Sequence, residues 1–455
     1  MKKTKLYLLV SLFSFAPLAA NANSLLDVYE LALQNDAQLK ADKAKYEAGV
    51  ENKTIARSGL LPQINAHAEA GNNDSDSTFN RPIPSKTTSD YDTSDWSISL
   101  NQPLFDMAAW YNYKQGVKLS EQAEAQFGAD QQSLIVRTAE AYFNVLRAIE
   151  TLEATIAEEK ALEKQLEQTK QRFEVGLTAI TDVHEAQAAF DTSRATTLEA
   201  RGNVSISYEA LEVLTGKPED QIAPLSSKFP VVSPVPANRA DWVEFSLKNN
   251  YNLKASKLQA DASLQNAKAN RSGHLPTLDA ALGYSDSTTD GVRESQAIDN
   301  ENDGSSVYLR LDVPIYSGGA VSGRSRQAYA QYTQSQEIYN STQRSVIQSA
   351  RSLHLSVETD VASVQARKQA IVSGQSALEA TQSGYEVGTR NLVEVLIAQR
   401  NLYQARRNYS DALFDYVIDS VKLREVAGML TPDDVQRVDQ WLMDDALISR
   451  SKYEN

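Results

Sequence analysis

Two long stretches of this chain contain no proline, and they limit its fold more than any other feature. One runs from Pro103 to Pro218 and the other from Pro314 to Pro432. Because proline interrupts helices, and because both stretches are rich in Ala, Gln, Glu, Leu, Lys and Arg, they are expected to form long helices. Apart from Glu159, apolar residues recur at every seventh position, as Val145, Leu152, Leu166 and Phe173, then Val357, Val364, Ile371, Leu378, Tyr385 and Leu392. This period predicts helices that supercoil around their neighbours, and about 65 uninterrupted residues would span roughly 100 Å.

Segments with apolar residues at alternate positions bracket these helical stretches. The four predicted strands are residues 64–70, 96–104, 276–285 and 305–316. A polar loop is predicted between the strands of each pair, at residues 72–95 and 286–304. Such alternation with long polar loops is typical of transmembrane β-strands, which need about 9–11 residues. On this pattern alone, a pair of soluble β-hairpins on a helical domain remains the alternative interpretation.

The chain contains an internal duplication, with an offset of about 212 residues between its halves. Residues 58–62 and 272–276 share the pattern S-G-x-L-P, and the sequence E-V-G ends at both Gly176 and Gly388. Each half is expected to contain a helix, a strand, a loop, a strand, a long helix, a glycine turn and a second long helix. The predicted parts are a first repeat at 23–216, a proline-rich connector at 217–240, a second repeat at 241–430, and a C-terminal segment at 431–455 with a short helix at 433–448.

Composition excludes several classes of function. Residues 1–22 have the basic start, apolar core and small-residue cleavage site of a secretory signal. Cysteine is absent, which excludes disulfides and thiolate chemistry, and the net charge of −14 argues against a nucleic-acid partner. No later stretch has the roughly 18 apolar residues of a transmembrane helix. The four histidines are scattered and no nucleotide-binding or nucleophile motif occurs, so neither an enzyme nor a bound cofactor or metal is expected.

Four strands from one chain cannot close a barrel in a membrane. An open sheet leaves two edges of unpaired backbone groups, and lipid offers them no hydrogen-bond partners. If its strands lie in a membrane, the chain must therefore assemble with copies of itself. Two copies would supply eight strands and three would supply twelve, and the residues alone do not decide between them.

Eight sequence blocks occur in a fixed order along the chain. They are residues 60–63, 102–107, 138–146, 172–177, 179–183, 273–279, 314–316 and 385–390. Through these blocks the chain resembles the TolC family of trimeric outer-membrane efflux channels, from Leu25 to about Leu430. The lipid-anchored relatives of that family begin with a cysteine, which this chain lacks. The resemblance implies an α+β membrane protein, a homotrimer whose twelve-stranded transmembrane β-barrel continues into a long α-helical coiled-coil tunnel in the periplasm.

The resemblance also implies a function. It is that of the outer-membrane exit duct of tripartite efflux pumps and type I secretion systems, a passive channel opened at its periplasmic end by docking partners. The expected partners are periplasmic adaptor (membrane fusion) proteins, inner-membrane pumps of the RND, ABC or MFS type, and outer-membrane lipid. The cargo would be drugs, detergents or proteins. A soluble periplasmic coiled-coil adaptor of an efflux system is the alternative.

Residues near the two glycine turns receive roles from the resemblance. Tyr385 and Arg390 match the residues that hold the periplasmic end of the tunnel shut. Thr181 and Asp182 match the residues that accept their links. The family's adaptor-docking tips correspond to Gly176, Leu177, Gly388 and Thr389.

Glu394 and Ile397 stand where the family has two rings of aspartates at its constriction. Ile397 departs from this pattern, because an aliphatic residue replaces the second acid one turn along the helix. Tight binding of a blocking cation is therefore not expected. Asp182 and Glu394 are equivalent in the two halves, and an alternative interpretation is that each acid only stabilises the first turn of its helix through the helix dipole.

Overall fold

The computed structural model describes residues 24–79, 85–443 and 445–454. The secretory signal predicted at residues 1–22 lies outside the described residues. The chain divides into two compact units. The helical unit comprises the described residues up to Lys40, Gln131–Trp242, and the described residues from Ala350 onward. The strand unit comprises Ala41–Asp130 and Val243–Ser349, with helices of its own beside the strands.

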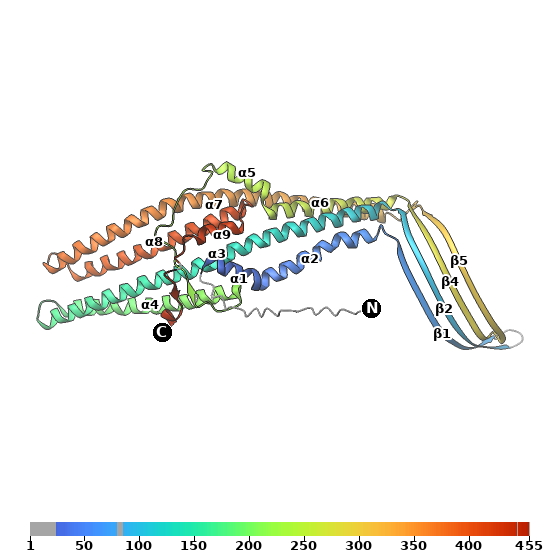
Figure 1. Cartoon of the computed structure of the whole chain (residues 1–455), viewed down its shortest axis with the longest axis horizontal. Helices are drawn as coiled ribbons and strands as arrows, with labels where there is room; N and C mark the ends of the chain where they lie inside the picture. The colour runs from blue at the N-terminus through green and yellow to red at the C-terminus, as the bar shows by residue number, and fades with distance from the viewer. Residues whose placement is uncertain (1–23, 80–84, 444, 455) are drawn as a thin grey trace, which may run out of the picture. The chain divides into compact units, whose positions relative to one another are not determined.

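Four long helices confirm the prediction from the proline-free stretches (Figure 1). They are α3 (Met107–Glu174, 68 residues), α4 (Ile180–Thr215), α7 (Ala320–Glu386, 67 residues) and α8 (Leu392–Val426). In the helical unit α3 and α4 form one antiparallel hairpin, and α7 and α8 form another. Val145 and Leu152 of α3 and Val357 and Val364 of α7 are at most 4 % exposed. The seven-residue repeat therefore marks the buried side of these helices.

The two hairpins turn in the same way. Gly176 and Gly388 have φ angles of 76° and 77°, in the left-handed region that favours glycine. The next residue closes each turn, because the N–H of Leu177 donates to the carbonyl of Arg172 at 2.8 Å, and the N–H of Thr389 donates to the carbonyl of Gly384 at 2.8 Å. This pairing across six residues is the Schellman helix ending. The backbone thus repeats the duplication that the sequence shows.

Shorter elements complete the two units. The helices are α1 (Leu25–Asn35), α2 (Ala37–Ser58), α5 (Arg239–Asn249), α6 (Tyr251–Arg271), η1 (Ser272–His274), α9 (Pro432–Asp439) and α10 (Ser451–Glu454), and the strands β3 (Gln221–Ile222) and β6 (Ile448–Ser449) pair with each other. The prediction of one helix over 433–448 is wrong in its extent. After Asp439 the chain leaves the helix, because Leu442 pairs with Leu225 and β6 pairs with β3. None of the helices in the described part of the chain has the length and hydrophobicity needed to span a membrane.

Four long antiparallel strands form the sheet of the strand unit. They are β1 (Gln63–Phe79), β2 (Ser85–Phe105), β4 (Thr277–Arg293) and β5 (Gln296–Asp312), paired in the order β1-β2-β4-β5. The loops predicted at 72–95 and 286–304 are wrong over most of their length. β1 and β2 remain paired as far as Phe79 and Ser85, and β4 and β5 remain paired up to residues 294–295. Backbone hydrogen bonds between strands keep these Asn-, Asp- and Ser-rich segments extended despite their low strand propensity.

The ends of the second strand pair have local causes. Glu294 and Ser295 have φ angles of 49° and 66°, and two consecutive positive φ values form the tight turn that matches the twist of a hairpin. β5 ends at Asp312, before the predicted end at residue 316. Pro314 follows closely, and proline has no N–H to continue the pairing.

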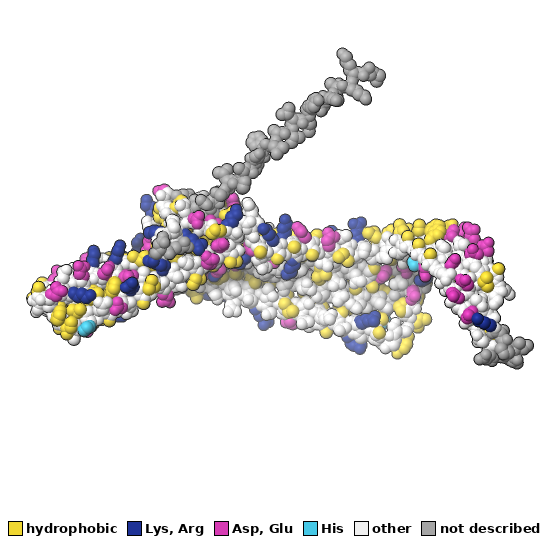
Figure 2. All heavy atoms as spheres, turned by 90° about the horizontal axis from the view of Figure 1, so that it is seen from below, with side chains coloured by type: hydrophobic (Ala, Val, Ile, Leu, Met, Phe, Trp, Pro, Cys, Tyr) yellow, Lys and Arg dark blue, Asp and Glu magenta, His cyan; other side chains and the backbone are white. Residues whose placement is uncertain are grey.

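The register places apolar residues of all four strands on one face of the sheet. Leu282 of β4 lies opposite Leu100 of β2 and Val307 of β5, and Leu100 lies opposite Ile64 of β1. The next row, on the opposite face, is polar or lacks a side chain; its members are Asn65, Ser99, Gly283 and Ser306. Ile64, Leu282 and Val307 are 69 %, 45 % and 79 % exposed, and Leu100 is half-buried. Figure 2 shows hydrophobic side chains gathered over the helix-proximal part of the strands and acidic side chains beyond them. The predicted alternation is therefore confirmed.

Candidate functional site

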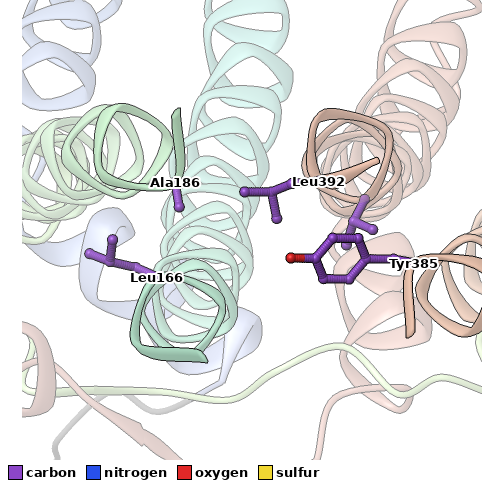
Figure 3. Close-up of a cluster of buried hydrophobic side chains, with 5 residues drawn as sticks. Leu166, Ala186, Tyr385 and Leu392 are labelled. Atoms are coloured by element: carbon purple, nitrogen blue, oxygen red, sulfur yellow. The ribbon is translucent and has the colours of Figure 1, made fainter. Parts of the chain in front are cut away.

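The ends of the two hairpins meet in a small buried cluster within the helical unit. It contains Leu166 of α3, Ala186 of α4, Tyr385 of α7, and Leu392 and Val395 of α8. Figure 3 shows Tyr385 and Leu392 directed toward the α3–α4 hairpin. All four helices thus contribute to one apolar contact close to both glycine turns. The residues assigned to the gate lie around this cluster.

Tyr385 lies deep in this cluster and is 8 % exposed. Its hydroxyl has no hydrogen-bond partner among the described residues. Its ring lies under the guanidinium of Arg172 of α3, which is 4.8 Å from the ring centroid. A cation over an aromatic face is attracted by the ring quadrupole. Within one chain, Tyr385 is therefore held by Arg172.

Thr181 and Asp182 lie at the start of α4, and neither contacts Tyr385 or Arg390 through a hydrogen bond or ion pair in the described chain. The carboxylate of Asp182 instead accepts a hydrogen bond from the hydroxyl of Thr178, four residues earlier. This contact fits an acid in the first turn of a helix, where the dipole favours negative charge. The links predicted for these residues remain predictions for contacts between chains.

Arg390 has a partner that the sequence analysis did not assign. Its guanidinium donates to the carboxylate of Glu394 at 2.6 Å, four residues further along the chain. The backbone N–H of Glu394 donates to the side chain of Asn391, the N-cap of α8, at 2.9 Å. The side chains of Arg390 and Glu394 are 59 % and 36 % exposed, so the pair contributes only about 0–1 kcal/mol. The charge of the proposed constriction acid is thus partly balanced within the same chain.

Ile397 lies one turn beyond Glu394 on α8 and is 43 % exposed. It lines a groove of about 580 Å³ between α4 and α8, together with Ala188 and Arg400. No second acid follows Glu394 at this level of α8, as the sequence already shows. The groove also contains Leu162 and Leu396, and of its two glutamates, Glu158 and Glu185, the first is already paired with Arg407.

The two glycine turns carry exposed apolar residues. Val175 and Leu177 of the first turn are 69 % and 68 % exposed, and Val387 of the second is 75 % exposed. The hydroxyl of Thr389 donates to the carbonyl of Gly384 at 3.1 Å, which adds to the backbone bonds of that turn. These ends are hydrogen-bonded turns with exposed apolar side chains.

Arg172 is the residue near the gate that sequence reasoning missed. The duplication gives no signal for it, because the equivalent position in the second half is Gly384. A side chain at Gly384 would come within 2.7 Å of Arg390. The two halves therefore differ at this position for a physical reason. The first half carries the cation of Arg172, whereas the glycine of the second half leaves room for Arg390.

Four aspartates gather where α7 and α8 face each other, farther from the turns. They are Asp360 of α7 and, at intervals of four residues, Asp411, Asp415 and Asp419 of α8. Burial raises the pKa of Asp360 to about 6, with further contributions from Asp419 and Asp415. Burial also raises the pKa of Asp411 and of Asp419. In the part of the chain that the structure describes, no group of three or more His, Asp or Glu side chains is arranged to hold a metal ion.

Comparison with known proteins identifies the family. The protein family described as "Outer membrane efflux protein" matches residues 28–217 and again residues 242–429, one match in each predicted repeat. "Outer membrane protein TolC" of Vibrio cholerae serotype O1 is 37 % identical over 423 residues, which cover 92 % of this chain and 94 % of that protein. The protein of the same name from Escherichia coli strain K12 is 35 % identical over 434 residues, covering 94 % and 86 %. "Proteases secretion protein PrtF" of Dickeya chrysanthemi is 32 % identical over 456 residues, covering 99 % and 97 %.

Solved structures with the same fold are more distant in sequence. CusC, described with transmembrane channel formation, has a TM-score of 0.75 at 17 % identity and covers 89 % of this chain and 92 % of its own. The outer membrane protein VceC of Vibrio cholerae has a TM-score of 0.73 at 18 % identity, with 89 % and 96 % covered. Together with the matches in both repeats, these findings show that the chain belongs to the outer membrane efflux protein family.

Proposed function

We propose that this chain is a passive exit duct in the outer membrane that serves efflux and type I secretion. The observation that carries the proposal is the four-stranded sheet with one apolar face, joined to two hairpins of long helices. Such a sheet can face lipid on one side and water on the other. The names of the relatives agree, since two are outer membrane protein TolC and one is a protease secretion protein. The family is one of outer-membrane channels, and no catalytic role is proposed.

The assembly that we propose is a homotrimer. In the described sheet, β1 and β5 each have a neighbour on one side only. Pairing β5 of one copy with β1 of the next would supply partners for both edges, which lipid cannot do. An eight-stranded barrel is largely filled by its own side chains, whereas more strands leave an open interior. Three copies and twelve strands therefore suit a duct better than two copies.

Adaptor proteins and inner-membrane pumps of the RND, ABC or MFS type are the partners that we propose. Val175, Leu177 and Val387 supply exposed apolar surface at the two hairpin turns, and exposed apolar surface of this kind is a feature of protein contact sites. The turns at Gly176 and Gly388 hold that surface in a fixed shape. Docking there would act on the adjacent apolar cluster.

The gate would lie at the same end. The hydroxyl of Tyr385 lacks a partner among the described residues of its own chain, and Thr181 or Asp182 of the adjacent copy could supply one. Glu394 would form a single ring of three carboxylates, weakened by Arg390, and Ile397 would form an apolar ring beside it. Such a gate would be closed by many weak contacts and would open in steps.

A soluble periplasmic adaptor, the alternative function, is not favoured. The relatives that match more than nine-tenths of this chain include two outer-membrane proteins. A bacterial strain that lacks its own exit duct tests the proposal. Expression of this chain should restore resistance to detergents and dyes, and the purified protein should conduct ions in planar bilayers. Recovery of the chain in the soluble periplasmic fraction, with no conductance, would instead identify an adaptor.

A further inference from the structure

Three ion pairs connect α3 to α8 within the helical unit. Each joins one helical hairpin to the other. The pairs are Glu140 with Lys422 at 2.5 Å, Arg147 with Asp415 at 2.6 Å, and Glu158 with Arg407 at 2.7 Å. Phe143 of α3 and Phe414 of α8 also contact each other here, with ring centroids 6.0 Å apart. The pairs are thus part of a continuous helix–helix contact.

The order of the charges alternates along both helices. From Glu140 to Arg147 to Glu158, α3 presents a negative, a positive and a negative charge, and α8 presents the opposite series. Glu140 and Arg147 are seven residues apart, and so are their partners Lys422 and Asp415. The helices run antiparallel, and these two pairs have the same spacing on each helix.

Apolar packing alone does not define how far α3 and α8 are displaced along each other. Val145 and Leu152 of α3 are buried seven residues apart, as are Phe414 and Val421 of α8 at the same level of the contact. A shift by seven residues would therefore place one apolar residue where another had been. Sequences with this repeat need polar or charged residues to specify a single register.

Such a shift is opposed by the charges. Moved one way, α8 would bring Asp415 beside Glu140; moved the other way, it would bring Lys422 beside Arg147. Like charges at contact distance repel, and most strongly where water is partly excluded. The Glu158–Arg407 pair alone would not prevent the shift that brings Asp415 beside Glu140. In that shift Arg400 would replace Arg407 beside Glu158, and opposite charges would still face each other. The pairs of Glu140 and Arg147 are therefore the decisive ones.

We infer that these three α3–α8 ion pairs form a register device, which fixes the axial position of one hairpin of the chain against the other. The Glu158–Arg407 pair strengthens it, since the two side chains are only 10 % and 15 % exposed. Arg407 also donates to the side chain of Gln404 at 3.0 Å, which holds the guanidinium in place.

The register sets the relative level of the two hairpin turns. α3 leads to the turn at Gly176, and α8 begins just after the turn at Gly388. A shift by seven residues would displace one turn from the other by about 10 Å, at about 1.5 Å per residue. A partner that contacts both turns requires their relative axial position to be fixed. This consequence rests on the proposed function, whereas the register itself rests only on the contacts within the chain.

Spin labels at the two turns measure the register directly. The chain has no cysteine, so cysteines introduced at the exposed Val175 and Val387 can be labelled selectively. Doubly labelled full-length chain, mixed with excess unlabelled chain, reports the distance within one copy by electron–electron double resonance. Lys422→Glu places a third acid beside Glu140 and Glu425, and should add a population with the turns displaced axially by about 10 Å.

The charge swap is the decisive variant. Reversing both pairs, Glu140→Lys with Lys422→Glu and Arg147→Asp with Asp415→Arg, restores opposite charges, keeps like charges facing each other in both shifted registers, and should return the distance distribution to that of the parent. Arg406→Glu is the matched control on α8, because Arg406 lies over the ring of Tyr403 in its own helix, and it should leave the distances unchanged. An unchanged distribution in Lys422→Glu, or a swap that fails to restore it, would overturn the inference. If Lys422→Glu does not fold, the swapped chain must still fold with parental distances. Conductance in bilayers, measured on the same samples, tests the proposed function separately.

Discussion

At the scale of single residues, the hydroxyl of Tyr385 is a buried polar atom with no hydrogen-bond partner in the part of its own chain that the structure describes. Leaving such a group unpaired costs about 1–3 kcal/mol, and contact between its ring and Arg172 offsets part of this cost. Tyr385 is therefore well placed to bond to a neighbouring copy and to be released again at low cost. Arg390 is similar, since its pair with Glu394 is exposed and weak.

The first prediction concerns the assembled gate. Combining Tyr385→Phe with Arg390→Ser removes a hydroxyl donor and a cation from each copy, and should raise the single-channel conductance in planar bilayers well above the parental value. Lys170→Ser, at an exposed position of α3, is the control and should leave the conductance unchanged. Parental conductance in the double variant, with intact assemblies, would remove both residues from the gate.

The second prediction isolates Arg172. Arg172→Gln keeps a polar side chain but loses the cation over the ring of Tyr385. It should lower the free energy of unfolding by about 0.5–2 kcal/mol and raise the frequency of channel opening. Arg172→Lys should recover part of both effects, because the cation remains. Equal behaviour of the Gln and Lys variants in denaturant titrations and bilayers would show that the charge over the ring has no role.

The third prediction concerns Ile397. A trivalent cobalt hexaammine ion should block the parental channel only weakly, because one carboxylate ring, partly balanced by Arg390, supplies few ligands. Ile397→Asp adds a second ring one turn away and should tighten the block markedly. Ile397→Asn is the matched control, because it is polar and of similar size to aspartate but carries no charge, and it should leave the block weak. Tight block of the parental channel, or an unchanged block in Ile397→Asp, would contradict the placement of Ile397 at the constriction.

At the scale of secondary-structure elements, α7 and α8 are joined by a contact that carries excess negative charge. Asp360 faces a row of three aspartates on α8, and only part of this charge is balanced, chiefly by Arg147 at Asp415. Burial, with Asp419 and Asp415 nearby, raises the pKa of Asp360 to about 6. The folded chain therefore binds a proton on Asp360 more tightly than the unfolded chain does.

The fourth prediction follows from the sign of that shift. Between the ordinary aspartate value of 3.8 and about 6, the folded state holds more protons than the unfolded state, so stability falls as the pH rises through this range. The loss is at most about 3 kcal/mol, and solvent screening reduces it. Asp360→Asn should reduce this fall, leaving the part that comes from Asp411 and Asp419, and should raise the unfolding midpoint at neutral pH. Glu379→Gln, an exposed change on α7, should leave the pH profile as it is in the parent, and an unaltered profile in Asp360→Asn would contradict the assignment.

At the scale of the whole molecule, the sheet is incomplete as a single copy. Its apolar face is exposed and its outer strands each lack one neighbour within the described chain. Both features are resolved together if copies join edge to edge and the apolar face contacts lipid. The same sheet would be an aggregation hazard for a chain that remained alone in water.

The fifth prediction tests which face meets lipid. Leu309 lies opposite Ala280 on the apolar face and is 69 % exposed. Leu309→Arg near the bilayer midplane should cost about 2–4 kcal/mol and reduce the yield of assembled oligomer in cross-linking and gel assays. Ser306→Arg, on the opposite face of the same strand, should assemble normally. Full assembly of Leu309→Arg would mean that the faces are reversed or that the sheet does not lie in a membrane.

The sequence by itself determined the features that depend on local periodicity. The long helices follow from two proline-free stretches, and the faces of the sheet follow from alternation, as at Leu282 and Leu100. The pair of Arg390 and Glu394 was also within reach, because residues four apart on a helix are neighbours.

The tertiary structure alone decided what depends on segments far apart in the chain. Residues 72–79 and 286–293 are polar enough to predict loops, yet they are strands, because backbone pairing with a neighbouring strand supplies hydrogen bonds that no local pattern encodes. Arg172 and Tyr385 meet across more than two hundred residues, and the α3–α8 ion pairs span similar distances. Propensity and periodicity describe one segment at a time, whereas a register or a side-chain partner exists only when two segments are packed together.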